Sequence, residues 1–181
     1  IIVVYNKKHF KNLKKIKLKN IKLIKGGKTR QESTLNALKF LIKQKGISKV
    51  LIHDSARPNF SKKLLKSIII KMKNSRAVIP ILKINDAIKQ KHGKNVISKN
   101  RNNLFVTQTP QCFNLREIFS LHKSYKDRYL DDDFSLLKDL KKIKLIEGES
   151  NNFKITNKND FLNLKKIFKS QMSLGIGFDV H

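Results

Sequence analysis

One stretch of the sequence places an acid and a base directly after a short apolar run: Lys49-Val50-Leu51-Ile52-His53-Asp54-Ser55-Ala56-Arg57-Pro58. The apolar run is typical of a strand buried on both faces of a parallel sheet, and Pro58 ends it because proline cannot donate to a ladder. Ligands of open α/β sheets bind just beyond the carboxyl ends of the strands. Asp54 and Arg57 are therefore candidate ligand-binding residues; the alternative is a structural ion pair that closes a turn.

The net charge of the chain is extreme, but it is not patterned like a nucleic-acid-binding surface. The 181 residues carry a formal charge of +28, and only six of the 41 basic residues are arginine. Nucleic-acid readers favour clustered arginine and interleaved aromatic residues, because forked hydrogen bonds and stacking give specificity. We interpret the evenly spread lysines as compositional bias on solvated faces and expect no specific nucleic-acid partner. A basic nucleic-acid-binding module remains an alternative function.

Cysteine usage and hydropathy indicate the compartment. Cys112 is the only cysteine, so an internal disulfide cannot form and a reducing environment is expected. No apolar run approaches the length that spans a bilayer, and no signal peptide is visible. We expect a cytoplasmic protein without a membrane partner. The chain begins without Met and ends within an apparent strand, so we interpret it as a piece of a longer protein.

Strands and helices alternate over the first half of the chain, which is long enough for one α/β domain. Helices are expected from Thr29, whose spacing to Glu32 suits a capping box, to Lys45, and from Ser61 to about Lys73. The expected strands are 1–5, 21–24, 49–54 and 77–82. This order is typical of a doubly wound parallel sheet.

Residues 83–106 break this alternation. Two β-like stretches flank His92-Gly93-Lys94, which predicts a hairpin that projects from the sheet. A hairpin with so few apolar residues is not stable alone, so we expect it to pack on a partner subunit. The segments expected to follow are helices at 115–125, up to 140 and after Asn157, strands at 143–146 and 153–156, and a linker at 171–173.

Seven motifs that recur in order resemble those of one family, the 2-C-methyl-D-erythritol 4-phosphate cytidylyltransferases (IspD). They are Gly26-Gly27-x-x-Arg30-x-x-Ser33-x-x-Asn36, His53-Asp54-Ser55-Ala56-Arg57-Pro58, Asp86 through Lys89, Arg101-Asn102-x-Leu104, Gln108-Thr109-Pro110-Gln111-x-Phe113, Asp132-Asp133-x-Ser135 and Asn152-x-Lys154-Ile155-Thr156. Together they are specific, although each alone is weak. The resemblance covers residues 1–170 and implies a Rossmann-like, mostly parallel sheet flanked by helices, of the nucleotide-diphospho-sugar transferase type, with a projecting β-arm.

The end of the chain resembles a second family. Residues 174–181, with the pattern Gly175-x-Gly177-Phe178-Asp179-Val180-His181, are similar to the opening strand of the cyclodiphosphate synthases (IspF). Asp179 and His181 would point to the same side of a strand, which suits two ligands of Zn²⁺ or another divalent cation. Without the preceding domain, ordinary strand residues would be the better interpretation. The order of the two parts resembles the fused bifunctional IspD/IspF enzymes.

The resemblance implies transfer of a cytidylyl group from CTP to methylerythritol phosphate, with release of pyrophosphate, in non-mevalonate isoprenoid synthesis. Mg²⁺ would accompany the CTP phosphates. The implied catalytic residues are Lys154 and Arg101; the implied substrate-binding residues are Asp54, Arg57, Arg101 and Thr109; and Gly27, Ser33 and Ser55 would bind CTP. Arg101 would reach a neighbouring active site across a homodimer formed through the 83–106 arm.

The sequence also departs from the family pattern. The glycine-rich loop that binds the CTP triphosphate has no counterpart here, so we expect residues 1–181 alone to be inactive. Lys28, Ala87 and Asp131 stand where other residue types are common in the family. An alternative enzyme is a related nucleotidyltransferase that acts on another polyol phosphate, such as ribitol phosphate.

Overall fold

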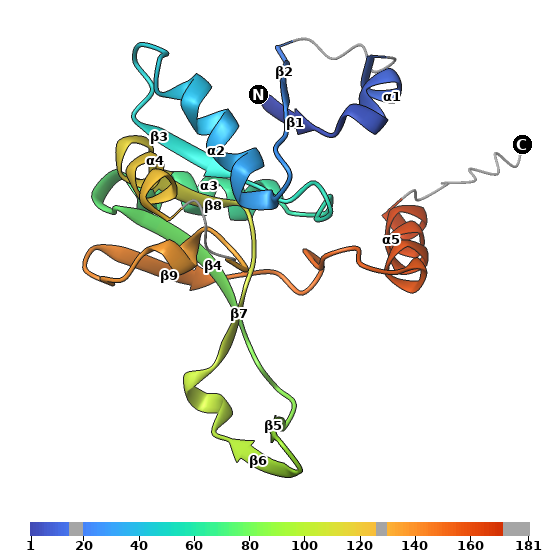
Figure 1. The fold of residues 1–181 in the computed structure, drawn as a ribbon. Helices are drawn as coiled ribbons and strands as arrows, with labels where there is room; N and C mark the ends of the chain where they lie inside the picture. Colours follow the sequence, from blue (N-terminus) through green and yellow to red (C-terminus); the bar gives the residue numbers. More distant parts are fainter. Residues whose placement is uncertain (15–19, 126–129, 172–181) are drawn as a thin grey trace, which may run out of the picture.

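A computed structural model describes residues 1–14, 20–125 and 130–171. The elements follow one another as β1 (Ile2–Tyr5), η1 (Lys7–His9), α1 (Phe10–Lys14), β2 (Lys22–Lys25), α2 (Arg30–Leu41), β3 (Lys49–Ile52), α3 (Lys62–Lys71), η2 (Met72–Asn74), β4 (Ala77–Lys83), β5 (Ile88–His92), β6 (Asn95–Lys99), η3 (Arg101–Asn103), β7 (Phe105–Thr107), β8 (Gln111–Asn114), α4 (Leu115–Ser124), η4 (Phe134–Leu136), β9 (Ile143–Glu147) and α5 (Lys158–Gln171). Figure 1 shows their arrangement.

The main sheet is mixed rather than mostly parallel. Its strand order is β3-β8-β4-β7, with β9 paired to β4. Only β4 and β9 form a parallel pair in this sheet, because β7 and β8 run antiparallel to their neighbours. The sheet that the sequence predicted did not include β7 and β8. They are short and flank Thr109-Pro110, where the sequence indicates a turn rather than a strand.

Strands β1 and β2 pair with each other in parallel but form a separate two-stranded sheet. Between this small sheet and β3 lies a cleft of about 680 Å³, lined by Ile1 to Val4, by one side of α2 and by Val50 to Ser55. The expected single sheet is therefore divided in two. The edges of β1 and β3 that face this cleft have no strand partner among the described residues.

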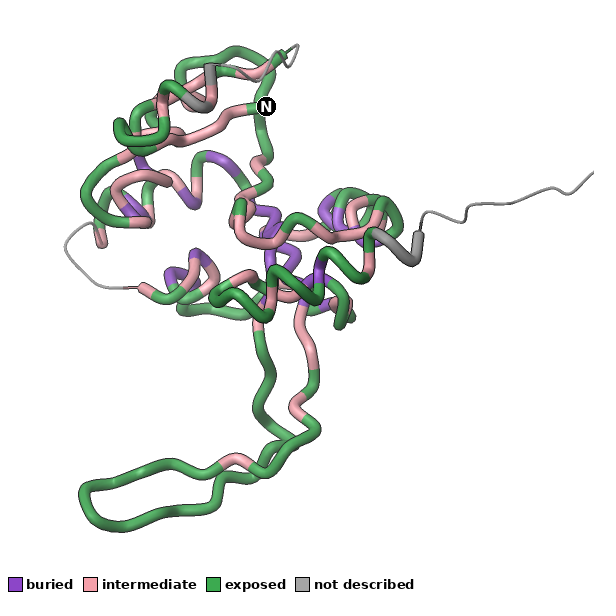
Figure 2. The backbone as a smooth tube through the Cα atoms, turned by 90° about the vertical axis from the view of Figure 1, so that its right-hand side faces the viewer, coloured by how far each residue is buried: buried purple, intermediate pink, exposed green. Residues whose placement is uncertain are grey.

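Helices cover both faces of the main sheet. Ala77 and Ile79 of β4 pack with Leu38 of α2 and Ile118 of α4, whereas Val78 faces the other way into a second cluster that also contains Ile68 of α3. Such alternation along a strand places a core on each face. Figure 2 shows the buried residues gathered around the central sheet.

The predicted hairpin is confirmed. Strands β5 and β6 pair antiparallel around Gly93, whose φ of +60° suits a residue without a side chain. The hairpin projects from the domain (Figure 1), and nearly all of its residues are exposed (Figure 2).

Other expectations differ in detail. The predicted helix up to Leu140 is only the short η4, and no strand forms over 153–156. The caps at Thr29, Ser61 and Asn157 are confirmed, since each side chain accepts from a backbone N–H three residues on. None of the described helices has the length and apolar character needed to cross a membrane. The predicted strand at 174–181 lies outside the described residues.

Candidate active site

Asp54 lies two residues beyond β3 and is held by two cations. Its Oδ1 is 3.4 Å from Arg30 Nε, and its Oδ2 is 3.2 Å from Lys154 Nζ. Arg30 is the first residue of α2, and Lys154 belongs to the loop between β9 and α5. Burial opposes ionisation of Asp54, but Arg30 and Lys154 outweigh it and hold the pKa of this carboxyl below its usual range. Asp54 is therefore a carboxylate at neutral pH.

Thr109 fixes the backbone of Asp54. Its Oγ1 accepts from Asp54 N at 3.0 Å and lies 3.0 Å from His53 Nδ1. His53 Nε2 lies 2.9 Å from the carbonyl of Arg57, which can only accept. A neutral His53 therefore carries its proton on Nε2, and the Thr109 hydroxyl donates to Nδ1. Burial lowers the pKa of His53, in keeping with the neutral ring.

The loop that carries Lys154 is fastened to the sheet by buried polar side chains. Gln108 Nε2 donates to the carbonyl of Glu149 at 2.8 Å, and Asn152 Nδ2 donates to the carbonyl of Thr109 at 2.9 Å. Arg57 Nη1 donates to the carbonyl of Asn152 at 2.9 Å. The guanidinium of Arg57 is thus engaged by the backbone around Lys154, and burial lowers its pKa.

A tight turn at the start of α2 brings the predicted CTP-binding residues to the same place. Gly27 N donates to Ser33 Oγ at 3.0 Å, and Ser33 Oγ donates to the carbonyl of Thr29 at 2.8 Å. A Cβ on Gly27 would lie 2.2 Å from Glu32 Cβ, so only glycine fits this turn. Arg30, Ser33, Asp54 and Ser55 all line the cleft between β1 and β3.

One predicted residue lies apart from this cluster, and two others cannot be placed relative to it. Arg101 is exposed in η3, where its Nη1 donates to the carbonyl of Asn85. This short helix belongs to the arm that projects from the domain in Figure 1. Asp179 and His181, the predicted metal ligands, lie outside the described residues. Within the described ranges, no three His, Cys, Asp or Glu side chains are grouped to hold a metal ion.

Sequence reasoning missed a buried support for Arg30. Arg30 Nη2 lies 2.6 Å from Asp133 Oδ2, and Asp133 Oδ1 lies 2.8 Å from His122 Nε2. Burial would raise the pKa of Asp133, but His122 and Arg30 together hold it below its usual range. The signal was an acidic run, Asp131 to Asp133, in a strongly basic chain. Its partner Arg30 lies 103 residues away, however, and no local motif pairs it with His122.

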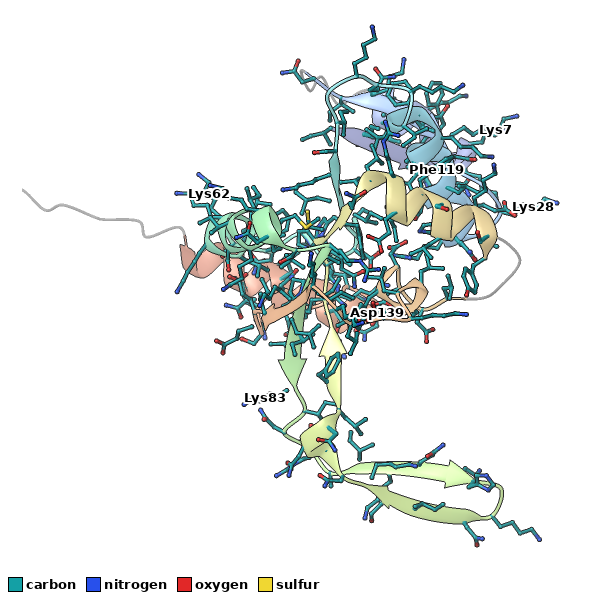
Figure 3. All side chains as sticks on the ribbon, turned by 90° about the vertical axis from the view of Figure 1, so that its left-hand side faces the viewer. Lys7, Lys28, Lys62, Lys83, Phe119 and Asp139 are labelled. Carbon is teal, nitrogen blue, oxygen red and sulfur yellow. The ribbon has the colours of Figure 1, made fainter. Side chains whose placement is uncertain are left out.

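The lysines that Figure 3 labels lie on several different elements of the described part of the chain. Figure 3 shows Lys7, Lys28, Lys62 and Lys83 at separate places around the periphery: in η1, just before α2, at the start of α3 and at the end of β4 near the base of the arm. This distribution supports the interpretation of spread charge on solvated faces.

Together, the fold and the site define an α/β protein with ligand-binding side chains at the carboxyl end of a sheet strand. A profile of the family "IspD: 2-C-methyl-D-erythritol 4-phosphate cytidylyltransferase" matches residues 1–170. The chain therefore belongs to the IspD family.

Individual relatives agree with this assignment. The bifunctional enzyme IspD/IspF of Pelagibacter ubique (strain HTCC1062) is 44% identical over 181 residues, which cover 100% of this chain and 47% of the relative. The structure of 4-diphosphocytidyl-2C-methyl-D-erythritol synthase from Anaerococcus prevotii has a TM-score of 0.82 at 29% identity, over 93% of this chain and 78% of that one. The bifunctional IspDF of Campylobacter jejuni has a TM-score of 0.70 at 27% identity, over 88% and 40%. The chain spans less than half the length of the bifunctional relative from Pelagibacter.

Proposed function

We propose that the protein containing this chain transfers a cytidylyl group from CTP to 2-C-methyl-D-erythritol 4-phosphate and releases pyrophosphate. The observation that carries the proposal is the arrangement of Arg30, Asp54 and Lys154 beside the Gly27–Ser33 turn, within a chain of the IspD family. We place this reaction in the cytoplasm, in the non-mevalonate isoprenoid pathway, with a cyclodiphosphate synthase as the second half of the protein.

The residues divide the work between charge and positioning. Asp54 accepts hydrogen bonds from polyol hydroxyls, and Lys154 leaves Asp54 to neutralise charge on the transferring phosphoryl group. Arg57, through Nη1, holds the Lys154 loop in place, and Thr109, through Oγ1, holds Asp54 in place. Ser33 and Gly27 shape the turn that receives the cytidine, and Ser55 is exposed beside it.

Magnesium enters this proposal with the nucleotide. Both carboxylate oxygens of Asp54 face cations, so this side chain is not arranged as a metal ligand on its own. Triphosphate oxygens are hard ligands that bind Mg²⁺ together with water. Bound in this way, the ion offsets the negative charge of the CTP phosphates. Zn²⁺ or another divalent cation belongs to the synthase half, through Asp179 and His181.

The cleft between β1 and β3 has room for a further strand, which supports our proposal that the cytidylyltransferase domain is longer than residues 1–170. It is walled by apolar side chains from both sheets and has Arg30, Asp54 and Ser55 at its polar end. A further strand ending in the glycine-rich loop would pair with the two free edges and bring its backbone N–H groups to the nucleotide. Residues 1–170 alone would then be inactive.

The projecting arm supports a homodimer. Val96 and Ile97 of β6 are 66% and 47% exposed, and Phe105 and Val106 at its base are also exposed. A two-stranded hairpin is marginally stable without further packing. We propose that the arm packs on a second copy of the chain and that Arg101 binds substrate phosphate in the active site of that copy.

The decisive experiment follows pyrophosphate release by the complete protein with CTP, Mg²⁺ and methylerythritol phosphate. Wild type should react with this polyol phosphate and not with ribitol phosphate, while Asp54→Ala and Arg101→Ala should lose activity. Absence of release from the folded, complete protein contradicts the proposal. Release with ribitol phosphate instead assigns the chain to the related nucleotidyltransferases.

Mixing the two inactive variants tests the role of the arm. If Arg101 serves the neighbouring subunit, a mixed dimer of Asp54→Ala and Arg101→Ala has one intact site, and random mixing restores about a quarter of wild-type activity. If Arg101 serves its own subunit, mixing restores nothing. Salt-sensitive binding to polyanions is expected in either case and does not identify a nucleic-acid function.

A further inference from the structure

A line of four side chains in direct contact runs from the core to the active site. His122 of α4 contacts Asp133, Asp133 contacts Arg30, and Arg30 contacts Asp54. The side chains of His122 and Asp133 are 1% and 0% exposed, so this end of the line is fully buried. Because a carboxylate can only accept, His122 carries a proton on Nε2 where it faces Asp133.

The buried end of the line fixes Arg30. Burying a carboxylate costs free energy unless it is paired and hydrogen-bonded. Asp133 is therefore held by its two partners and cannot exchange them for water. Arg30 uses Nη2 for Asp133 at 2.6 Å and Nε for Asp54 at 3.4 Å at the same time. Only a planar guanidinium offers two donors in this fixed relation; a lysine does not.

The other cation at Asp54 is held less firmly. The side chain of Lys154 is 44% exposed, compared with 32% for Arg30, and Asp54 is the one acidic group paired with it among the described residues. In the proposed reaction, Lys154 moves from Asp54 to the substrate phosphate. Arg30 is then the cation that keeps Asp54 ionised and correctly oriented.

We propose that His122 and Asp133 are positioning residues which, through Arg30, hold the Asp54 carboxylate toward the polyol hydroxyls of the substrate. This inference rests on the proposed function for the identity of that substrate. The competing explanation is that His122 and Asp133 only fill and stabilise the core between α4 and η4.

The chain provides a matched control for this cluster. Arg76 also binds two carboxylates, with Nε 3.0 Å from Glu117 Oε1 and Nη1 3.2 Å from Asp139 Oδ2, and its side chain is 34% exposed. It precedes β4, at the end of the sheet opposite to Asp54. Figure 3 labels Asp139 on the loop before β9. Arg76→Lys therefore removes a similar forked contact away from the site.

The test compares steady-state kinetics of the complete protein and its variants. Asp133→Asn, His122→Leu and Arg30→Lys should each raise KM for methylerythritol phosphate by about tenfold, the effect of one charged hydrogen bond, with little change in kcat. His122→Gln should restore the wild-type KM because its amide can donate to Asp133. Arg76→Lys should leave KM unchanged. If the three site variants have the same KM and kcat as Arg76→Lys, the proposal is overturned.

A second readout does not depend on activity. The NMR chemical shift of the Asp54 carboxyl carbon should change in His122→Leu and Asp133→Asn, and stay in place in Arg76→Lys. An unchanged Asp54 signal in all folded site variants overturns the positioning role, even if the enzyme is active. An inactive wild type with a displaced Asp54 signal in the variants contradicts the proposed function but supports the positioning role. If Asp133→Asn does not fold, His122→Leu and Arg30→Lys decide both readouts.

Discussion

Replacing Thr109 with valine tests whether its hydroxyl fixes the position of Asp54. Thr109 is 3% exposed, and its Oγ1 lies 3.0 Å from both Asp54 N and His53 Nδ1. Valine has nearly the same shape, so the substitution removes two hydrogen bonds without leaving a large cavity. The Asp54 N–H and His53 Nδ1 are then left without these partners.

The expected loss in the free energy of unfolding follows from the burial of the Asp54 N–H and His53 Nδ1. A hydrogen bond contributes about 1 kcal/mol net, and an unpaired buried polar group costs about 1–3 kcal/mol. Both contacts are only partly buried, so the lower part of this range applies. We expect Thr109→Val to lower the free energy of unfolding by about 2–4 kcal/mol. With a urea m-value of about 2 kcal/mol/M, the midpoint falls by about 1–2 M.

Urea unfolding followed by circular dichroism measures this loss. Thr34→Val, at a half-buried position of α2 that lines the cleft, is the matched control and should change stability by less than about 0.5 kcal/mol. A Thr109→Val protein as stable as the control would refute the reasoning. If its KM for the polyol phosphate nevertheless rose, the hydroxyl would face substrate, as the family resemblance implied.

Lys154→Met should lower kcat by about 10²–10³-fold in the pyrophosphate assay, because it removes the charge proposed to stabilise the transferring phosphoryl group; Lys144→Met, on the exposed side of β9, should not. The folded pKa of Asp133 lies below its usual value, so its contribution to the free energy of unfolding is complete above about pH 4 and is lost as pH falls through the folded pKa. In urea titrations at different pH values, Asp133→Asn should therefore weaken the loss of stability at acidic pH. Because burial lowers the pKa of His53, its neutral ring stabilises the fold above about pH 6.5, and this contribution shrinks as pH falls toward the folded pKa; His53→Gln should weaken the dependence there. Burial raises the pKa of Cys112 to about 11, so a thiol reagent at pH 8 should modify it only as fast as the protein unfolds, and rapid labelling of the folded protein would contradict its burial.

The residues that carry the family resemblance were recognisable because they stand in short motifs. Asp54 follows an apolar run, Ser33 belongs to the motif that begins at Gly26-Gly27, and Thr29 and Ser61 cap helices. Each of these features depends on neighbours within a few residues. The arm was likewise visible as a break in the alternation of strands and helices.

The pairing of the strands could not be predicted from such short motifs. Strands β7 and β8 have only three and four residues. Strand β8 lies between β3 and β4, although these two strands follow one another in the chain. Short segments of this kind become strands because the edges on either side offer hydrogen-bond partners. Their own residue types carry a weak signal.

The sequence by itself determined the family, the helix caps and the residues that face the nucleotide and the polyol phosphate in our proposal. Only the tertiary structure decided that Arg57 and Thr109 hold backbone and that Arg30 joins Asp54 to a buried Asp133 and His122. Arg30 and Asp133 are 103 residues apart, and Asp54 and Thr109 are 55 apart. Local periodicity does not predict such pairs. Whether two polar atoms come within hydrogen-bond distance depends on how whole helices and strands pack, and not on the neighbouring residues in the sequence.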